Sequence, residues 1–144
     1  MPSLYAGLLF FFAHTGVHSQ ISMRESGPGV LQPLQTLRVM CKVTGASLTD
    51  SSNMHGVHWI RQAPGKGLEW VGGIYHNNDI YRSQSLQSRV TISSDTANKE
   101  VYLELRSVET RDRGTYYCAR DVGGGWHGDF DVWGQGTQVT VTAA

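Results

Sequence analysis

The sequence is poor in the residues that characterise several protein classes. It has two cysteines and four prolines in 144 residues, and only 17% of its residues are charged. Two cysteines permit one disulfide but no cysteine-built metal site. Lys and Arg number 12 and so do Asp and Glu, so the chain has no basic surplus for nucleic acid or an anionic membrane. We therefore expect neither as a partner.

No apolar run is long enough to cross a membrane. The run at 4–13 has ten residues, whereas a transmembrane helix needs about 20. A short apolar run near the N-terminus, followed by the small residues Val17 and Ser19, is typical of a secretory signal peptide. We therefore predict that 1–19 is cleaved from one domain formed by 20–144, which is secreted or displayed at the cell surface.

Catalytic signatures are also missing from the sequence. It contains no phosphate-cradling glycine motif, no nucleophile elbow and no metal-binding signature. Two histidines, His55 and His58, lie close together, but no further defined ligand accompanies them to fix a metal geometry. We predict that the chain is not an enzyme and that it needs no cofactor or metal.

What the sequence does contain is a series of short stretches in which apolar and polar residues alternate. The stretch 37–43 places three aliphatic residues and a cysteine on one face, and 101–105, 115–120 and 139–141 repeat the alternation. A period of two is typical of half-buried strands, and no helical stripe of useful length competes with it. The pattern predicts an antiparallel all-β sandwich in which each sheet buries one face.

The two cysteines occupy inward-facing positions of two different predicted strands. A disulfide between Cys41 and Cys118 would therefore join the sheets across the core, as the predicted secretory route permits. Trp59 lies between them in sequence, and we expect it to pack on the bridge.

Taken together, these residues resemble the variable domain of an immunoglobulin heavy chain, over 20–144. Tyr116, two residues before the second cysteine, is similar to the tyrosine corner of that family. The Trp-Gly-Gln-Gly sequence at 133–136 is similar to its joining-segment motif, in which the glycines permit a β-bulge. The resemblance implies an immunoglobulin variable-type Greek-key β-sandwich of two antiparallel sheets with one inter-sheet disulfide.

Two ion pairs are implied by the same resemblance. Arg89 and Asp112 match a pair at the base of the sandwich, and Arg120 and Asp131 match a pair that braces the third binding loop.

The resemblance further implies three antigen-binding loops at one end of the sandwich, at about 46–58, 73–81 and 121–132. Their Tyr, Trp, Ser, Asn and Gly content suits non-covalent protein recognition. The candidate antigen-binding residues are Asp50, Ser51, Ser52, Asn53, Met54, His55 and His58 in the first loop, Tyr75, His76, Asn77, Asn78 and Asp79 in the second, and Asp121, Val122, Gly123, Gly124, Gly125, Trp126, His127, Gly128 and Asp129 in the third.

Two questions about these loops stay open from sequence alone. Trp126 is either an anchor that inserts into an antigen pocket or a side chain that folds back over its own domain or the light-chain contact. Four of the six histidines lie in or beside the loops, so antigen binding is either pH-dependent or carries histidines placed there by chance.

A second surface is implied by positions that face a light-chain variable domain in the family. Gln62 would hydrogen-bond an equivalent glutamine on that partner. Heavy chains that work without a light chain carry polar residues at the positions of Gly67 and Leu68, so we predict pairing. The alternatives are a single-domain binder without a light chain and an immunoglobulin-like receptor or adhesion module. The predicted interface residues are Ile60, Gln62, Gly67, Leu68, Trp70, Tyr117 and Trp133.

Overall fold

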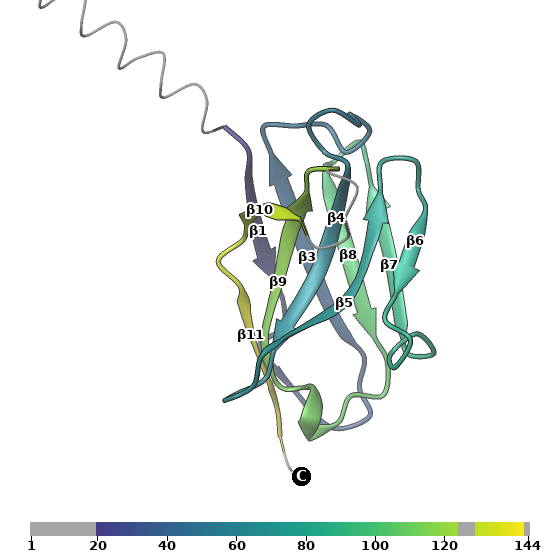
Figure 1. The fold of residues 1–144 in the computed structure, drawn as a ribbon. Coiled ribbons are helices and arrows are strands. Elements are labelled where there is room, and N and C mark those ends of the chain that lie inside the picture. The colour runs from purple at the N-terminus through teal and green to yellow at the C-terminus, as the bar shows by residue number, and fades with distance from the viewer. Residues whose placement is uncertain (1–19, 124–128, 143–144) are drawn as a thin grey trace, which may run out of the picture.

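In a computed structural model, which describes residues 20–123 and 129–142, the chain forms two β-sheets stacked in two layers (Figure 1). The predicted signal peptide and the loop residues 124–128 lie outside the described residues. The strands are β1 (Ser22–Ser26), β2 (Val30–Leu31), β3 (Leu37–Thr44), β4 (Gly56–Gln62), β5 (Leu68–Tyr75), β6 (Ile80–Arg82), β7 (Val90–Asp95), β8 (Glu100–Leu105), β9 (Gly114–Asp121), β10 (Phe130–Trp133) and β11 (Thr137–Val141).

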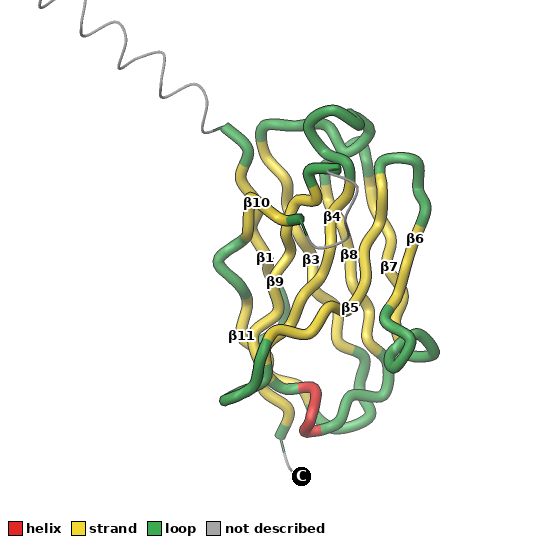
Figure 2. The backbone as a smooth tube through the Cα atoms, in the orientation of Figure 1, coloured by secondary structure: helices red, strands yellow, loops and turns green. Residues whose placement is uncertain are grey.

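The strand order confirms the predicted all-β sandwich. One sheet has the order β1-β3-β8-β7, and the other has the order β2-β11-β9-β4-β5-β6, with β10 paired to β9. The single helical turn among the described residues is a 3-10 turn at Thr110–Asp112 (Figure 2). The pairing of β2 with β11 is parallel, a feature that the alternation pattern did not predict, whereas the other pairs are antiparallel.

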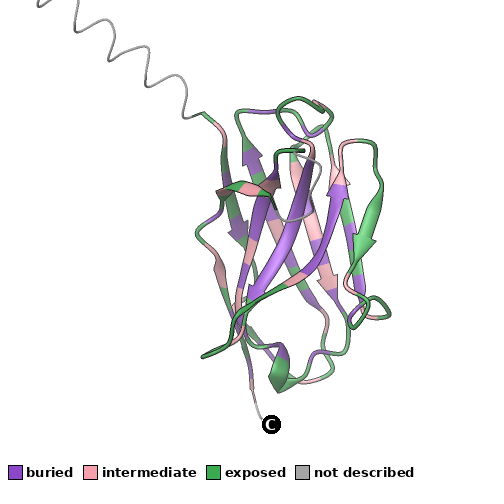
Figure 3. Cartoon of the chain, viewed as in Figure 1, coloured by how far each residue is buried: buried purple, intermediate pink, exposed green. Residues whose placement is uncertain are grey.

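The core lies between the two sheets, where the alternating apolar residues meet. Leu37, Val39, Cys41 and Val43 of β3 are buried, and the residues between them are more exposed. Figure 3 shows buried segments along the strands of both layers. Each sheet therefore turns one apolar face inward, as the period of two predicted.

The predicted disulfide crosses this core. Cys41 and Cys118 are bonded, with their Cα atoms 6.3 Å apart. Trp59 is the ladder partner of Cys118 across β4 and β9, and both residues are fully buried. The bridge joins β3 of one sheet to β9 of the other, so it links the two layers directly.

A buried ionic cluster closes the base of the sandwich around Asp112, which has no exposed surface. Its carboxylate accepts hydrogen bonds from Arg89 Nη2 at 2.5 Å, which confirms the predicted pair, and from Arg61 Nη1 at 2.8 Å, which was not predicted. The Tyr116 hydroxyl donates to the Asp112 carbonyl at 2.7 Å and completes the tyrosine corner. Burial alone would raise the pKa of Asp112, but the hydrogen bonds from Arg89, the Glu109 backbone N–H and Arg61 outweigh it and lower that pKa.

The glycines after Trp133 form the predicted bulge. Trp133 pairs with Ala119 and Thr137 pairs with Tyr116, so three residues of this segment face two residues of β9. The buried Glu25 carboxylate accepts the backbone N–H groups of Cys118 at 2.8 Å and Gly136 at 2.9 Å. A Cβ atom at 134 would lie 2.1 Å from that carboxylate, so glycine is required for the close approach.

Leu34 has a backbone conformation that is unfavourable for leucine. Its φ is +73° and its side chain is 78% exposed. The left-handed region costs a residue with a Cβ atom about 1–2 kcal/mol, whereas glycine adopts it freely at some cost in chain entropy. We expect Leu34→Gly to raise the free energy of unfolding by about 0.5–1 kcal/mol in urea denaturation.

The control for this prediction is the same change at Leu68, another exposed leucine. Leu68 lies in β5 and is not among the residues with positive φ. Glycine in a strand is unfavourable, so Leu68→Gly is expected to lower stability. A loss of stability in Leu34→Gly as well would contradict the strain argument.

Candidate binding loops and partner-facing surface

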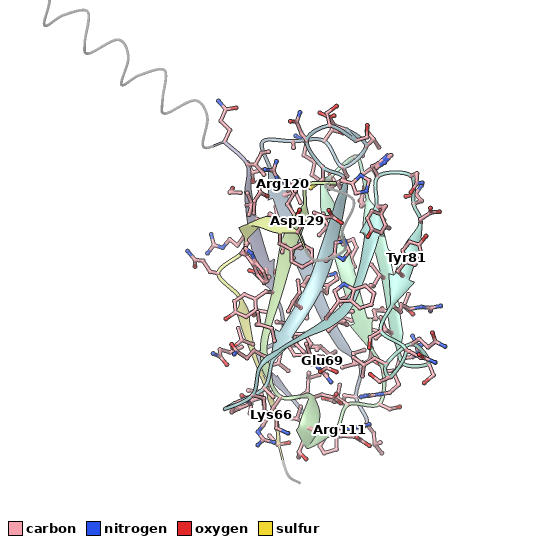
Figure 4. All side chains as sticks on the ribbon, in the orientation of Figure 1. Lys66, Glu69, Tyr81, Arg111, Arg120 and Asp129 are labelled. Atoms are coloured by element: carbon pink, nitrogen blue, oxygen red, sulfur yellow. A yellow bond between two sulfur atoms is a disulfide. The ribbon has the colours of Figure 1, made fainter. Side chains whose placement is uncertain are left out.

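Three connections gather at the end of the sandwich that lies opposite the C-terminus (Figure 1). They are the β3–β4 connection at 45–55, the β5–β6 connection at 76–79, and the described ends of the β9–β10 connection, at 122–123 and 129. The His76 backbone N–H donates to the His55 carbonyl at 3.0 Å, which ties the second connection to the first. In Figure 4, the labelled Arg120 and Asp129 lie at this end, and Lys66 and Arg111 lie at the other.

The first loop is held in a turn by its own side chains. The Asp50 carboxylate accepts the Ser52 backbone N–H at 3.0 Å and the Asn53 side-chain amide at 2.7 Å. These bonds lower the pKa of Asp50, and the bond from Asn53 makes the largest contribution. Such a turn fixes the loop backbone and leaves the side chains of residues 51–53 exposed.

The second loop is a short turn whose side chains point to solvent. Asn77 donates from its side chain to Asp79 at 3.2 Å, and its amide oxygen accepts the Asp79 backbone N–H at 3.1 Å. Asn78 has a φ of +71°, which asparagine tolerates better than most residues. All three residues are exposed, so they are available to a bound molecule.

The base of the third loop is braced as the family resemblance implied. Arg120 forms an ion pair with Asp131, with its Nε atom 2.9 Å from Asp131 Oδ1. The same guanidinium donates through Nη1 to the Asn53 carbonyl at 2.9 Å. Arg120 thus links the third loop to the first. Trp126 and His127, with the neighbouring glycines at 124, 125 and 128, lie outside the described residues, so their predicted roles stay predictions.

Three of the predicted antigen-binding side chains are buried, and the prediction that they contact antigen directly is wrong in this structure. Met54 is 1% exposed, His58 is fully buried and Asp121 is 2% exposed. Met54 packs into the core, while His58 and Asp121 lie within strands β4 and β9. The predicted loop ranges were too long because these flanking residues belong to the strands.

His58 and Asp121 instead form a buried polar cluster beneath the loops. His58 Nε2 lies 3.2 Å from Asp121 Oδ2, and the Trp70 indole N–H donates to His58 Nδ1 at 2.9 Å. Burial raises the pKa of Tyr75 to about 12, helped by the negative charge of Asp121 and a hydrogen bond to it. This cluster was not predicted from the sequence, although His58 directly precedes the inward-facing Trp59 and alternation puts it on the opposite face.

The larger sheet carries the predicted partner-facing residues on its outer face. Leu68 is 58% exposed and Trp133 is 39% exposed. The Trp133 ring contacts that of Tyr117 edge-on, with centroids 6.0 Å apart, and Trp70 and Tyr117 are half-buried. Gln62 and Gly67 are also exposed, and the Gln62 amide donates to the Lys66 carbonyl at 2.9 Å. These strands and turns therefore bring an apolar set of side chains to one face.

Ile60 is the exception among the predicted interface residues. It is 3% exposed, because its ladder partners Trp70 and Tyr117 flank it on both sides. The prediction that Ile60 directly contacts a partner is wrong for this structure. Its side chain lies between those of Trp70 and Tyr117 on the same face of the sheet.

Comparison with known proteins shows the family of the chain. The profile described as Immunoglobulin V-set domain matches residues 32–142. The chain belongs to the immunoglobulin V-set family.

The V-set domain is similar in sequence to individual heavy-chain V regions. One from Xenopus laevis, XIG14, is 46% identical over 136 residues, which cover 94% of this chain and 96% of the relative. One from Mus musculus, MOPC 141, is 44% identical over 131 residues, 87% of this chain and 88% of the relative. The Homo sapiens immunoglobulin delta heavy chain is 46% identical over 132 residues, and the match spans 25% of that longer protein.

Membership in this family confirms two predictions about the V-set domain. Its relatives are heavy-chain V regions, which confirms the resemblance drawn from Cys41, Trp59 and Cys118. Heavy-chain V regions are not enzymes, which confirms the prediction that the chain is not an enzyme. Within residues 20–123 and 129–142, no helix is long and apolar enough to span a membrane.

Proposed function

We propose that the V-set domain recognises antigen through its three loops while paired with a light-chain variable domain. The observation that carries the proposal is the apolar outer face of the larger sheet, on which Leu68 and Trp133 are exposed beside Trp70 and Tyr117. A contiguous apolar patch on a soluble domain marks an interaction site. The aromatic residues give it the composition of an interface core.

The loops supply the surface for antigen. The exposed residues at 51–53 and 77–79 are small and polar, and such side chains make adaptable hydrogen bonds in antibody binding sites. Trp126, which follows three glycines, is the proposed aromatic anchor of the third loop.

Pairing is tested by Leu68→Arg in the chain co-secreted with light-chain variable domains. The added charge would be buried unpaired at the interface, so we expect the equilibrium constant for the heterodimer to fall by at least about 100-fold. Light scattering measures the mass of the complex, and titration measures its affinity. The matched control is Leu34→Arg, the same change at a leucine that is exposed in the turn between β2 and β3, and it is expected to pair normally.

Two outcomes would contradict the pairing proposal. A soluble monomer that binds none of a broad panel of light chains would favour a single-domain binder, in which the loops act alone. Equal loss of pairing in the two arginine variants would show that the apolar face of the larger sheet is not the contact surface.

A receptor or adhesion module is the second candidate, and the genomic locus distinguishes it. An antibody heavy chain is assembled from separate segments, so the coding sequence should be interrupted between Asp112 and Thr140. One uninterrupted exon across that stretch would favour the receptor.

We further propose that the chain is secreted or displayed at the cell surface after removal of residues 1–19. N-terminal sequencing of the product from a secretory host should begin at Gln20. A product that retains Met1, or that starts well inside the domain, would contradict this processing.

A further inference from the structure

The buried cluster beneath the loops contains a histidine whose protonation pattern is fixed by its neighbours. The Trp70 indole N–H can only donate, so the His58 Nδ1 atom that receives it at 2.9 Å must carry a lone pair. The ring proton then resides on Nε2, from which it is donated to Asp121 Oδ2 at 3.2 Å. His58 is therefore a neutral imidazole in one tautomer, with each ring nitrogen bonded to a different strand.

The position of the ring depends on two local irregularities of β5. Trp59 pairs with Gly72 but Ile60 pairs with Trp70, so Val71 is an extra residue in the ladder. This bulge shifts the alternation and puts Trp70 and Tyr75, five residues apart, on the same face beside His58. A Cβ atom at residue 73 would lie 2.4 Å from the His58 ring, so a glycine is needed beneath it.

The two bonds of His58 lead to two different functional regions. Trp70 belongs to the proposed partner-facing surface. Asp121 is the last residue of β9, and its Oδ1 atom accepts the Gly123 backbone N–H of the third loop at 2.8 Å. Tyr75, which also bonds Asp121, contacts His55 of the first loop edge-on, with ring centroids 5.2 Å apart. Phe130 at the start of β10 packs on His58 with centroids 5.1 Å apart.

We propose that His58 is a positioning residue that couples the partner-facing Trp70 to the base of the third loop through Asp121. The imidazole orients the indole of Trp70 with one nitrogen and the carboxylate of Asp121 with the other. A paired light chain that holds Trp70 then also stabilises the turn at Gly123. This inference rests on the proposed function, since it concerns how light-chain pairing and loop geometry depend on each other.

Two substitutions each remove one of the two bonds. In His58→Asn the amide oxygen takes the place of Nδ1, so it can still accept from Trp70 but cannot reach Asp121. In His58→Gln the amide nitrogen takes the place of Nε2, so it can still donate to Asp121 but no longer accepts from Trp70. The two variants serve as controls for each other, because each keeps the bond that the other removes.

The experiment uses the chain expressed from its full 144-residue sequence in a secretory host. Hydrogen exchange of the Gly123 amide reports on the third-loop base, and affinity for a light-chain variable domain that binds the unmodified chain reports on Trp70. Loss of one buried hydrogen bond should change the exchange rate of the Gly123 amide or the affinity for the light chain by about tenfold. We expect His58→Asn to speed Gly123 exchange about tenfold with pairing nearly unchanged, and His58→Gln to weaken pairing about tenfold with Gly123 exchange nearly unchanged.

Nitrogen-15 NMR of the unpaired chain tests the tautomer directly and needs no partner. For His58 we expect one set of imidazole signals, with an unprotonated Nδ1 and a protonated Nε2. We also expect the indole N–H of Trp70 to exchange slowly with solvent. If both His58 variants alter both readouts equally while the chain stays folded, or if the imidazole shows no fixed tautomer, the positioning role is wrong. If the unmodified chain pairs with no light chain, the proposed function fails, while the tautomer and the Gly123 exchange still decide the role of His58.

Discussion

Replacing both cysteines, as in Cys41→Ala/Cys118→Ala, is expected to lower the free energy of unfolding by about 4.5 kcal/mol. The two residues are 77 positions apart in the sequence, so the bridge closes a long loop in the unfolded chain. A cross-link of this span removes much of the conformational entropy of that state. Domains have only about 5–15 kcal/mol of stability in total, so the variant should be only marginally folded at 37 °C. Guanidinium denaturation followed by tryptophan fluorescence measures the change.

A second variant separates the cross-link from the loss of core volume. Cys41→Ala/Cys118→Val fills more of the space left by the sulfur atoms, while it also lacks the bridge. We expect both double variants to be destabilised by similar amounts, because the entropic effect depends on the closed loop and not on the side chains. Recovery of most of the stability in the valine variant would show that packing, and not the cross-link, is the main contribution.

Asp112→Asn is expected to lower the free energy of unfolding by about 3–5 kcal/mol at pH 7. The substitution removes the charge that Arg61 and Arg89 share, and Arg61 itself is 9% exposed. Arg61 keeps its ion pair with Glu69 at 2.7 Å, but both guanidinium groups lose the buried carboxylate that compensates for their lost solvation. Urea denaturation measures the loss. The control is Glu104→Gln, which removes the charge from the exposed pair with Arg38 and should cost less than about 1 kcal/mol.

The Asp112 carboxylate should also make the free energy of unfolding depend on pH. Because the folded-state pKa of Asp112 is lowered, its contribution is fully present above the unfolded value of about 3.9 and is lost as the pH falls through the folded value. The unmodified chain should therefore lose stability steeply below about pH 4, and Asp112→Asn should show a shallower slope there. Identical slopes in the two proteins would mean that other carboxylates determine the acid sensitivity.

The framework could be predicted because its signals are local or involve few residues. Alternation along β3, β8 and β9 gave the inward faces, and the only two cysteines fell on such faces, so the bridge followed. The pair of Arg89 with Asp112 and that of Arg120 with Asp131 came from family resemblance. No local signal exists for the third participant, Arg61, since an arginine on an inward strand position has no visible partner until the strands are assembled.

The binding end was predicted less well, for a physical reason. Composition identifies loop-forming residues but does not say where a strand resumes, so the polar His58 and Asp121 were assigned to loops. Met54 was assigned to the antigen-binding surface, but its side chain packs in the core. A loop of this length can turn one side chain back toward the core. Ile60 was assigned to the exposed outer face, but its neighbours on that face cover its side chain.

The sequence by itself determined the all-β class, the inward faces, the disulfide and the location of the three loops. These depend on the period of two, on cysteine number and on motifs that are contiguous in the chain. Only the tertiary structure decided that the Val71 bulge brings Trp70 and Tyr75 to one face and that His58 bonds two strands at once. A one-residue shift in register reverses which face a side chain occupies, and that register is set by the packing of β4 between β5 and β9.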